Sequence, residues 1–240
     1  MIRGLSFDLW NTLIENKHYT SQRVAILERY LKDAGYHHSN AKIEFSYLNG
    51  IRVNIISDIE RTIRHIPLEE RIDRILQDLH VILPSETTNA LMIDFEEIIL
   101  LEPPILKNGV YNTLKTIVDR WKLPITLISD TGITPGRILK EMLAHHDVLK
   151  YFQATIFSDE TGRNKPDAKP FQLAIQSLQC SADQIIHTGD LLHTDVIGAQ
   201  TAGMKAIWFR PDFKLSPNSF NPDYIIDNFA EILPIIEGLT

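Results

Sequence analysis

The stretch Gly4-Leu5-Ser6-Phe7-Asp8-Leu9-Trp10-Asn11-Thr12-Leu13 decides how the rest of the chain is interpreted. Its apolar first half predicts a buried strand, and a polar turn follows directly after Asp8. Ligands bind at the carboxyl ends of strands in an open α/β sheet, where an aspartate can act as a nucleophile or a metal ligand. An aspartate after a strand more often caps a turn. The role of Asp8 therefore depends on what the later strands bring near it.

Composition and charge are those of an ordinary globular protein. Of the 240 residues, 44% are hydrophobic and 23% are charged, which is enough apolar material for a core. The net charge of −7 argues against nucleic-acid binding, and no run of about 18 apolar residues indicates a membrane span. A single cysteine, Cys180, excludes an internal disulfide. Without a signal-peptide pattern, these features predict a cytoplasmic protein, and they leave a monomer and a homodimer equally open.

Residues 16–104 follow a helical pattern without an intervening strand. Four amphipathic helices are predicted, one beginning at Thr20 or Ser21 and ending at Gly35, and the others separated by Pro67, Pro84 and Pro103. Four such helices in one block predict a small bundle that buries its own core. The apolar stripes comprise Val24, Leu27, Leu31 and Ala34; Phe45, Leu48, Ile55, Ile59 and Ile63; Leu68, Ile72, Ile75, Leu79 and Ile82; and Leu91, Phe95 and Ile98.

From residue 105 onward, helices and strands alternate. Strands are predicted at 125–128, 154–157, 184–188, 205–209 and 224–226, and helices at 110–121, 135–145, 170–178, 195–201 and 229–237. Non-alternating apolar strands between helices predict a parallel sheet that is covered on both faces. The predicted fold class is therefore α/β: a Rossmann-like core of residues 1–15 and 105–240, with residues 16–104 inserted as an all-α helical bundle.

Polar side chains fall at the carboxyl ends of four predicted strands. Asp8 follows the first, Ser129-Asp130 the second, Lys165 lies in the loop after the third, and Asp190 and Asp195 follow the fourth. These ends share one edge of a parallel sheet, so the side chains can converge. Three carboxylates would make an oxygen-rich site for Mg²⁺, while a hydroxyl and an ammonium would hold a phosphate.

The order and spacing of these motifs closely resemble the haloacid dehalogenase superfamily of hydrolases, in its phosphatase-like branch. The helical block lies where this family inserts its cap domain, so the resemblance covers essentially the whole chain. The motifs are Phe7-Asp8-Leu9-Trp10-Asn11-Thr12-Leu13, Ile128-Ser129-Asp130, Lys165-Pro166-Asp167 with Phe171, and Thr188-Gly189-Asp190 continuing through Asp195 to Gly198-Ala199.

The resemblance implies an Mg²⁺-dependent hydrolase of a small phosphorylated metabolite. Asp8 would attack phosphorus and form an aspartyl-phosphate. Asp8, the backbone carbonyl of Trp10, and Asp190 would hold Mg²⁺, and Asp195 would bind it directly or through water.

The other motif residues are expected on the substrate side of the site. The resemblance implies that Ser129 and Lys165 hold the phosphoryl oxygens, that Lys165 also pairs with Asp8, and that Thr12 braces the first loop. Asp130 stands where the family usually has asparagine, which adds a negative charge near the phosphate. Trp10 would also contact the substrate and shape the entrance.

Trp10 is the main departure from the family pattern. The family's phosphatases carry a second aspartate at this position, which protonates the leaving group and then activates water. General acid–base catalysis typically contributes about 10²- to 10⁴-fold in rate. An acyl or aryl phosphate would lose less from its absence than an alkyl phosphate.

Two alternatives follow from Trp10. The dehalogenase members of the family carry an aromatic residue here, so carbon–halogen displacement by Asp8 in a 2-haloacid is one alternative. Their chemistry does not use Mg²⁺, whereas Asp190 and Asp195 are retained here, which favours the metal-dependent interpretation. The other alternative is a non-catalytic protein that binds a phosphorylated ligand or a partner.

Several other polar residues have modest expected roles. Asp167 is interpreted as a helix cap, and Asp159 and Glu160 as solvated loop charges. His187 is interpreted as a hydrogen-bonded strand residue, and His193 as a less favoured substitute acid.

Overall fold

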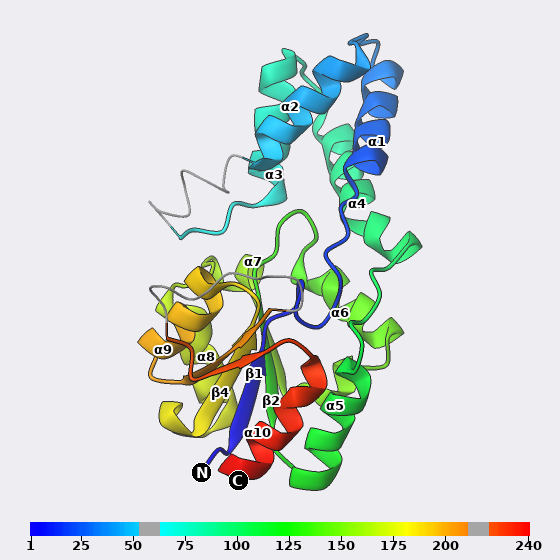
Figure 1. Ribbon diagram of the computed structural model, residues 1–240. Helices are drawn as coiled ribbons and strands as arrows, with labels where there is room; N and C mark the ends of the chain where they lie inside the picture. The colour runs from blue at the N-terminus through cyan, green and yellow to red at the C-terminus, as the bar shows by residue number, and fades with distance from the viewer. Residues whose placement is uncertain (53–62, 211–220) are drawn as a thin grey trace.

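The computed structural model describes residues 1–52, 63–210 and 221–240 (Figure 1). Within these residues one sheet has the order β3-β2-β1-β4-β5-β6, and every neighbouring pair is parallel. The predicted parallel sheet is thereby confirmed. Its strands are β1 (Gly4–Phe7), β2 (Ile125–Ser129), β3 (Ala154–Phe157), β4 (Ile185–Gly189), β5 (Lys205–Phe209) and β6 (Tyr224–Ile226).

Strand β1 lies where the strand order reverses. It pairs with β2 on one side and with β4 on the other, and all four of its residues are buried. Phe7 is in register with Leu127 and with Thr188, and the N–H of Asp8 donates to the carbonyl of Thr188 at 2.9 Å. In sheets of this order the ligand crevice opens at the reversal point, so Asp8 begins at the position where a ligand would bind.

Helices cover both faces of the sheet, and each strand divides its side chains between them. Ile207 and Phe209 of β5 belong to one buried cluster, whereas Ala206 and Trp208 belong to the other. One face of the sheet carries α5 (Val110–Thr116), α6 (Gly136–His145) and α10 (Ile232–Leu239), and the other carries α8 (Ala168–Leu178) and α9 (Ile197–Thr201).

No helix within the described residues is long and apolar enough to cross a membrane.

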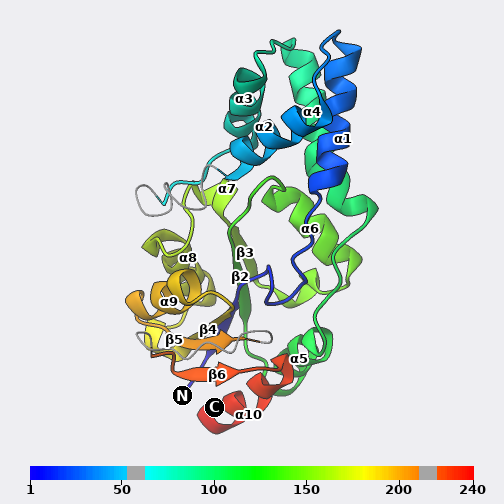
Figure 2. The same cartoon turned by 45° about the horizontal axis from the view of Figure 1, so that its top comes forward.

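An inserted helical region stands beyond the carboxyl ends of the strands (Figures 1 and 2). It has its own buried cluster, with Leu27, Ile72 and Phe95 among its members, which confirms the inserted bundle. The division at residues 16 and 104 stays a prediction. We call this region the cap; its helices are α1 (Thr20–Asp33), α2 (Asn40–Arg52), α3 (Leu68–Leu79) and α4 (Ser85–Leu101).

Three predicted core positions of the cap are wrong. Ala34 is exposed, because α1 ends at Asp33. Phe45 is 60% exposed, because α2 turns Ile43 and Tyr47, four residues apart, toward the cap core instead. Ile82 is 86% exposed, because α3 ends at Leu79 and His80 adopts a left-handed conformation. The predicted positions Ile55 and Ile59 lie outside the described residues.

The start of α6 shows how a tertiary contact replaces a local cap. The sequence favours Thr134 as the N-cap, but Pro135 occupies that position and no side chain of the preceding turn caps the helix. The carboxylate of Asp159 accepts from the N–H of Gly136, with oxygens at 3.1 and 3.2 Å, and from the hydroxyl of Thr131 at 3.0 Å. Asp159 lies in α7 (Ser158–Thr161), where only a loop was expected. Its interpretation as a solvated charge is therefore wrong.

The prediction that Asp167 caps a helix is confirmed. The Asp167 side chain accepts from the N–H of Lys169 at 2.8 Å and caps α8.

Candidate active site

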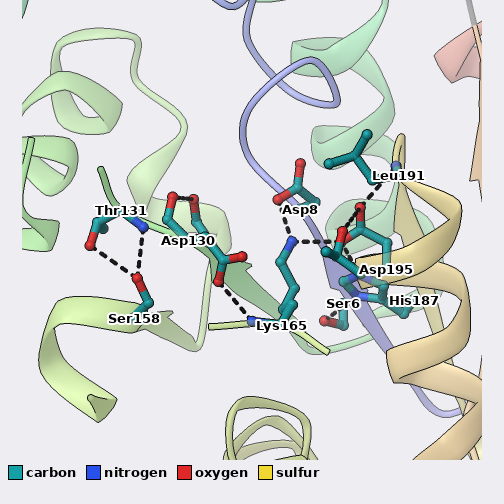
Figure 3. A network of polar contacts seen from close by, with 11 residues as sticks. Ser6, Asp8, Asp130, Thr131, Ser158, Lys165, His187, Leu191 and Asp195 are labelled. Atoms are coloured by element: carbon teal, nitrogen blue, oxygen red, sulfur yellow. Dashed lines mark hydrogen bonds and ion pairs between the residues drawn. The ribbon is translucent and has the colours of Figure 1, made fainter. Parts of the chain in front are cut away.

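The side chain of Lys165 lies between two aspartates at the carboxyl edge of the sheet (Figure 3). Its Nζ donates to Oδ1 of Asp8 and to Oδ1 of Asp195, each at 2.5 Å. All three side chains are buried, so the ion pairs are shielded from water. The expected pairing of Lys165 with Asp8 is present. Together with the bond to Asp195, it connects the loop after α7 to the residues that follow β1 and β4.

Three buried carboxylates, those of Asp8, Asp190 and Asp195, converge here. One oxygen from each lies within 4.8 Å of the others. A single ammonium, that of Lys165, faces them, so the cluster carries excess negative charge. An all-oxygen, anionic donor set of this size suits a hard divalent cation such as Mg²⁺.

The excess charge is visible in the pKa values. Burial raises the pKa of Asp8 to about 8; Lys165 opposes this shift, and the carboxylates of Asp195 and Asp190 add to it. Burial together with Asp195 likewise raises the pKa of Asp190 to about 6, against a hydrogen bond from Asn11. Both shifts arise mainly because burial disfavours a charged carboxylate, and the neighbouring carboxylates add to that effect.

Asp195 and Lys165 keep their charges. Burial alone would raise the pKa of Asp195, but Lys165 and His187 outweigh it and hold that pKa well below its usual range. Burial alone would lower the pKa of Lys165, yet Asp195 and Asp8 outweigh it and raise that pKa. The site therefore contains one firmly ionised pair beside two carboxyls that bind protons readily.

His187 makes a contact with Asp195 that was not predicted from the sequence. Its Nε2 lies 3.3 Å from Oδ1 of Asp195, and its Nδ1 lies 2.9 Å from Oγ of Ser6. Burial lowers its pKa, which favours the neutral ring. A neutral ring that donates from Nε2 to Asp195 and accepts from Ser6 satisfies every group. We expected His187 to be a hydrogen-bonded residue of a strand, but we did not expect its contact with Asp195. Periodicity does not predict that the chain after β4 turns back and brings Asp195 beside this strand.

Gly189 allows Asp195 to fold back against the end of β4. A Cβ at Gly189 would lie 2.3 Å from Cγ of Asp195, which is closer than real contacts permit. The N–H of Leu191 then donates to Oδ2 of Asp195 at 3.0 Å. On the other side, Asn11 adopts a left-handed conformation with a φ of 58°, which asparagine tolerates, and its side chain bonds Asp190.

Asp130 points at the protein backbone. Its Oδ1 accepts from the N–H of Lys165 at 2.9 Å, and burial raises its pKa to about 6. The residue thereby holds the loop that carries Lys165. Its expected contact with substrate stays a prediction.

Ser129 and Thr12 are also buried at this edge. The hydroxyl of Ser129 donates to the carbonyl of Asp130 at 3.2 Å. The hydroxyl of Thr12 has no hydrogen-bond partner within the described part of the chain. Their expected roles in phosphate binding and in bracing the loop stay predictions.

A cavity of about 660 Å³ opens between the core and the cap. Six of the eight predicted site residues line it, whereas Ser129 and Thr12 do not; His193 is exposed and is also not among the lining residues. The cap and the segment leading to it also supply lining residues. Among these, the sequence indicated only Arg23 as a possible substrate contact, and it favoured a solvated helix face for that residue. The preferred interpretation is wrong, since Arg23 is buried; helix periodicity does not tell how a bundle is oriented over a sheet. The six residues are Asp8, Trp10, Asp130, Lys165, Asp190 and Asp195, and the cap side adds Lys17, His18, Tyr19, Arg23 and Tyr47.

The cap also contacts the loop that carries Lys165. The N–H of Asn164 donates to the carbonyl of Ile63 at 2.9 Å, and the N–H of His65 donates to the carbonyl of Gly162 at 3.1 Å. Nδ1 of His65 lies 3.1 Å from Oγ of Ser158, which in turn accepts from the N–H of Thr131. Ile63 and His65, which precede α3, are thus bonded to the loop that carries Lys165 and to Ser158 at the start of α7.

Two solved structures with different described activities share this fold. 2-Haloacid dehalogenase from Pseudomonas syringae pv. Tomato has a TM-score of 0.75 and 23% identity, over all of both chains. The HAD-hydrolase YfnB from Bacillus subtilis, bound to magnesium, has a TM-score of 0.64 and 18% identity, over 98% of both chains. At these identities the likeness establishes the shared fold.

Curated relatives match part of the chain. 5-Amino-6-(5-phospho-D-ribitylamino)uracil phosphatase YigB of Escherichia coli is 34% identical over 102 residues, which are 42% of this chain and 39% of that protein. Glyceraldehyde 3-phosphate phosphatase of Pyrococcus furiosus is 30% identical over 114 residues, 45% of this chain and 47% of that protein. The chain thus spans less than half the length of the curated relatives that it matches.

The family model covers most of the chain. The model for haloacid dehalogenase-like hydrolases matches residues 2–203, which include every motif described above. The motif order, the parallel sheet, the inserted cap and the buried aspartate cluster agree with this match. The chain belongs to the haloacid dehalogenase-like hydrolases.

Proposed function

We propose that this protein is an Mg²⁺-dependent phosphatase of small phosphorylated metabolites that works through an aspartyl-phosphate on Asp8. One observation carries the proposal: Asp8 is paired with Lys165 and converges with Asp190 and Asp195 beside an open cavity. The two curated relatives described above are phosphatases by name, which supports phosphate esters over other substrates.

The residues divide the reaction between them. Lys165 holds Oδ1 of Asp8, which leaves Oδ2 available to attack phosphorus. A bond forms between Oδ2 and phosphorus while the bond to the leaving-group oxygen breaks; water then attacks the same phosphorus, and the Asp8 oxygen is released. Asp8, Asp190 and Asp195, with the backbone carbonyl of Trp10, would hold Mg²⁺, which supplies positive charge for the phosphoryl oxygens.

Trp10 restricts which substrates turn over quickly. Its indole lines the cavity at the position of the family's acid, and its N–H can donate a hydrogen bond but is too weak an acid to transfer a proton to a leaving oxygen. The leaving group must therefore depart as an anion. We infer that acyl and aryl phosphates, whose leaving groups are stable anions, are better substrates than alkyl phosphates.

A panel of phosphate esters and 2-haloacids, each assayed with and without Mg²⁺, tests the proposed function. Phosphate release that requires Mg²⁺ supports it. Halide release without metal would support dehalogenation, the alternative that the aromatic Trp10 favours. Tight binding of a phosphate analogue without any turnover would identify a non-catalytic binding protein.

The affinity for Mg²⁺ is expected to rise with pH. In the metal-free protein the pKa values of Asp8 (about 8) and Asp190 (about 6) are raised above the ordinary 3.8. The stability that these two groups contribute is present below that ordinary value and is lost as the pH rises toward their folded-state values. Mg²⁺ must displace their protons, so its stabilising effect should grow from about pH 6 to about pH 8.5.

Thermal unfolding with and without saturating Mg²⁺ at several pH values measures this effect. Asp190→Asn should abolish the shift at every pH, whereas Asp183→Asn, on the surface, should preserve it. A Tm shift that is equal at both ends of the pH range would contradict the prediction.

A further inference from the structure

Arg23 is a buried cation of the cap that faces the cavity. It lies on α1, is 7% exposed and lines the cavity together with Asp8 and Lys165. Its Nε donates to the carbonyl of Phe95 at 3.0 Å, and its Nη2 donates to the hydroxyl of Thr134 at 3.1 Å. Its Cζ also lies 5.4 Å from the centre of the Tyr19 ring. These contacts hold the guanidinium at the junction of cap and core.

Arg23 forms no ion pair with a carboxylate of the described residues. Its contacts are with a carbonyl, a hydroxyl and an aromatic ring, all neutral. A guanidinium has five N–H donors, so these two acceptors leave donors for another partner. Buried cations are normally paired with an anion, because an unpaired buried charge is strongly unfavourable. The cavity is where a counter-ion can enter.

The other cations that line the cavity are already paired. Lys165 pairs with Asp8 and Asp195, and Lys17 pairs with Glu102 at 2.7 Å. All carboxylates that line the cavity belong to core loops at the strand ends, none to the cap. The cap side of the cavity thus has one cation without an anionic partner in the described protein, which matches an anionic group of single charge.

We propose that Arg23 binds a carboxylate of the substrate, at the end away from the phosphate. This inference rests on the proposed phosphatase function and narrows its substrate to phosphorylated carboxylic acids. The planar fork of a guanidinium matches a carboxylate in geometry and charge, and a carboxylate brings the single negative charge that Arg23 lacks. A cavity of about 660 Å³ accommodates a metabolite that spans both groups.

Arg71 provides a matched control. It is a second buried arginine of the cap, 6% exposed, and its guanidinium donates to the carbonyls of Ile66 and Ile51. It is not among the residues that line the cavity. Replacing Arg71 removes an equally buried guanidinium from the same bundle without touching the proposed binding position.

The test compares 4-carboxyphenyl phosphate with 4-carbamoylphenyl phosphate, which have the same shape and differ in the charge of the distal group. The 3-substituted pair is included because it places that group at a different distance. We expect the protein to prefer the carboxylate in kcat/KM by roughly 10- to 100-fold. Arg23→Gln should bring the ratio close to one, Arg23→Lys should give an intermediate ratio, and Arg71→Lys should keep the ratio of the unmodified protein.

The outcomes separate this inference from the proposed function. Equal hydrolysis of acid and amide by the unmodified protein would overturn the inference while leaving a phosphatase. If no ester releases phosphate, the proposed function fails, and calorimetric titration of the same esters into Asp8→Asn decides the inference by binding alone. Loss of the ratio in Arg71→Lys as well would overturn it, because the effect would then be one of cap stability. If Arg23→Gln fails to fold, Arg23→Lys with a thermal melt serves in its place.

Discussion

Replacing Trp10 by aspartate is expected to raise kcat/KM for an alkyl phosphate by about 10²- to 10⁴-fold. The new carboxyl would stand in the cavity two residues after Asp8, where it can protonate the departing oxygen and then activate water. The gain should be smaller for an aryl phosphate, because an aryl oxide leaves without a proton. Steady-state phosphate release from both esters, with Mg²⁺ present, measures the difference.

Trp10→Asn is the control for this change. Asparagine has the size of aspartate and removes the indole in the same way, but it cannot donate a carboxyl proton. It should therefore give little of the gain. If asparagine and aspartate raise the rate equally, the indole acts by blocking the cavity, and the missing acid is not what limits turnover.

Asp8→Asn is expected to lower phosphate release by about 10⁴-fold or more, as removal of a covalent nucleophile does in other enzymes. The amide oxygen is a poor nucleophile, and the change also breaks the ion pair with Lys165. Asp167→Asn makes the same chemical change at a residue that caps α8 and lies 3.9 Å from Arg163, outside the cavity lining, and asparagine is an equally good N-cap. The control should retain the activity of the unmodified protein.

Mass spectrometry of the intact protein adds a second readout. When the reaction with an acyl phosphate is quenched rapidly, the unmodified chain should carry one phosphoryl group on Asp8, and Asp8→Asn should carry none. Substantial phosphate release by Asp8→Asn would show that water attacks the substrate directly. In that case Asp8 would be a metal ligand and not the nucleophile.

The convergence of the motif residues was predictable because it depends on topology alone. Asp8, Asp130 and Asp190 each lie within two residues of the end of a predicted strand, and parallel strands bring such positions to one edge. The identity of the sheet and the placement of the bundle followed from the same alternation. Lys165 required more: its loop is long, and only the resemblance to a family indicated that it reaches Asp8.

The features that could not be predicted from the sequence depend on how the cap is oriented over the sheet. Arg23 and Tyr47 were visible as residues of amphipathic helices, but whether they face the cap core, solvent or the cavity depends on how the bundle sits over the sheet. The cap of α6 by Asp159 was hidden for a similar reason, since a local hydroxyl at Thr134 looked sufficient. The hydroxyl of Thr134 instead accepts a hydrogen bond from the guanidinium of Arg23.

The contact between the cap segment and the Lys165 loop has a consequence for how the enzyme would open. The two chain crossings between core and cap lie side by side, since Glu15 donates to the carbonyl of Ile105 and Lys107 to that of Leu13, and they form one hinge. The bonds of Ile63 and His65 form a further attachment, at the segment that leads into α3 (Figures 1 and 2). A rotation of the cap must either break these bonds or move residues 162–164, which directly precede Lys165. Access to the cavity and the placement of the ammonium that holds the nucleophile are therefore mechanically linked.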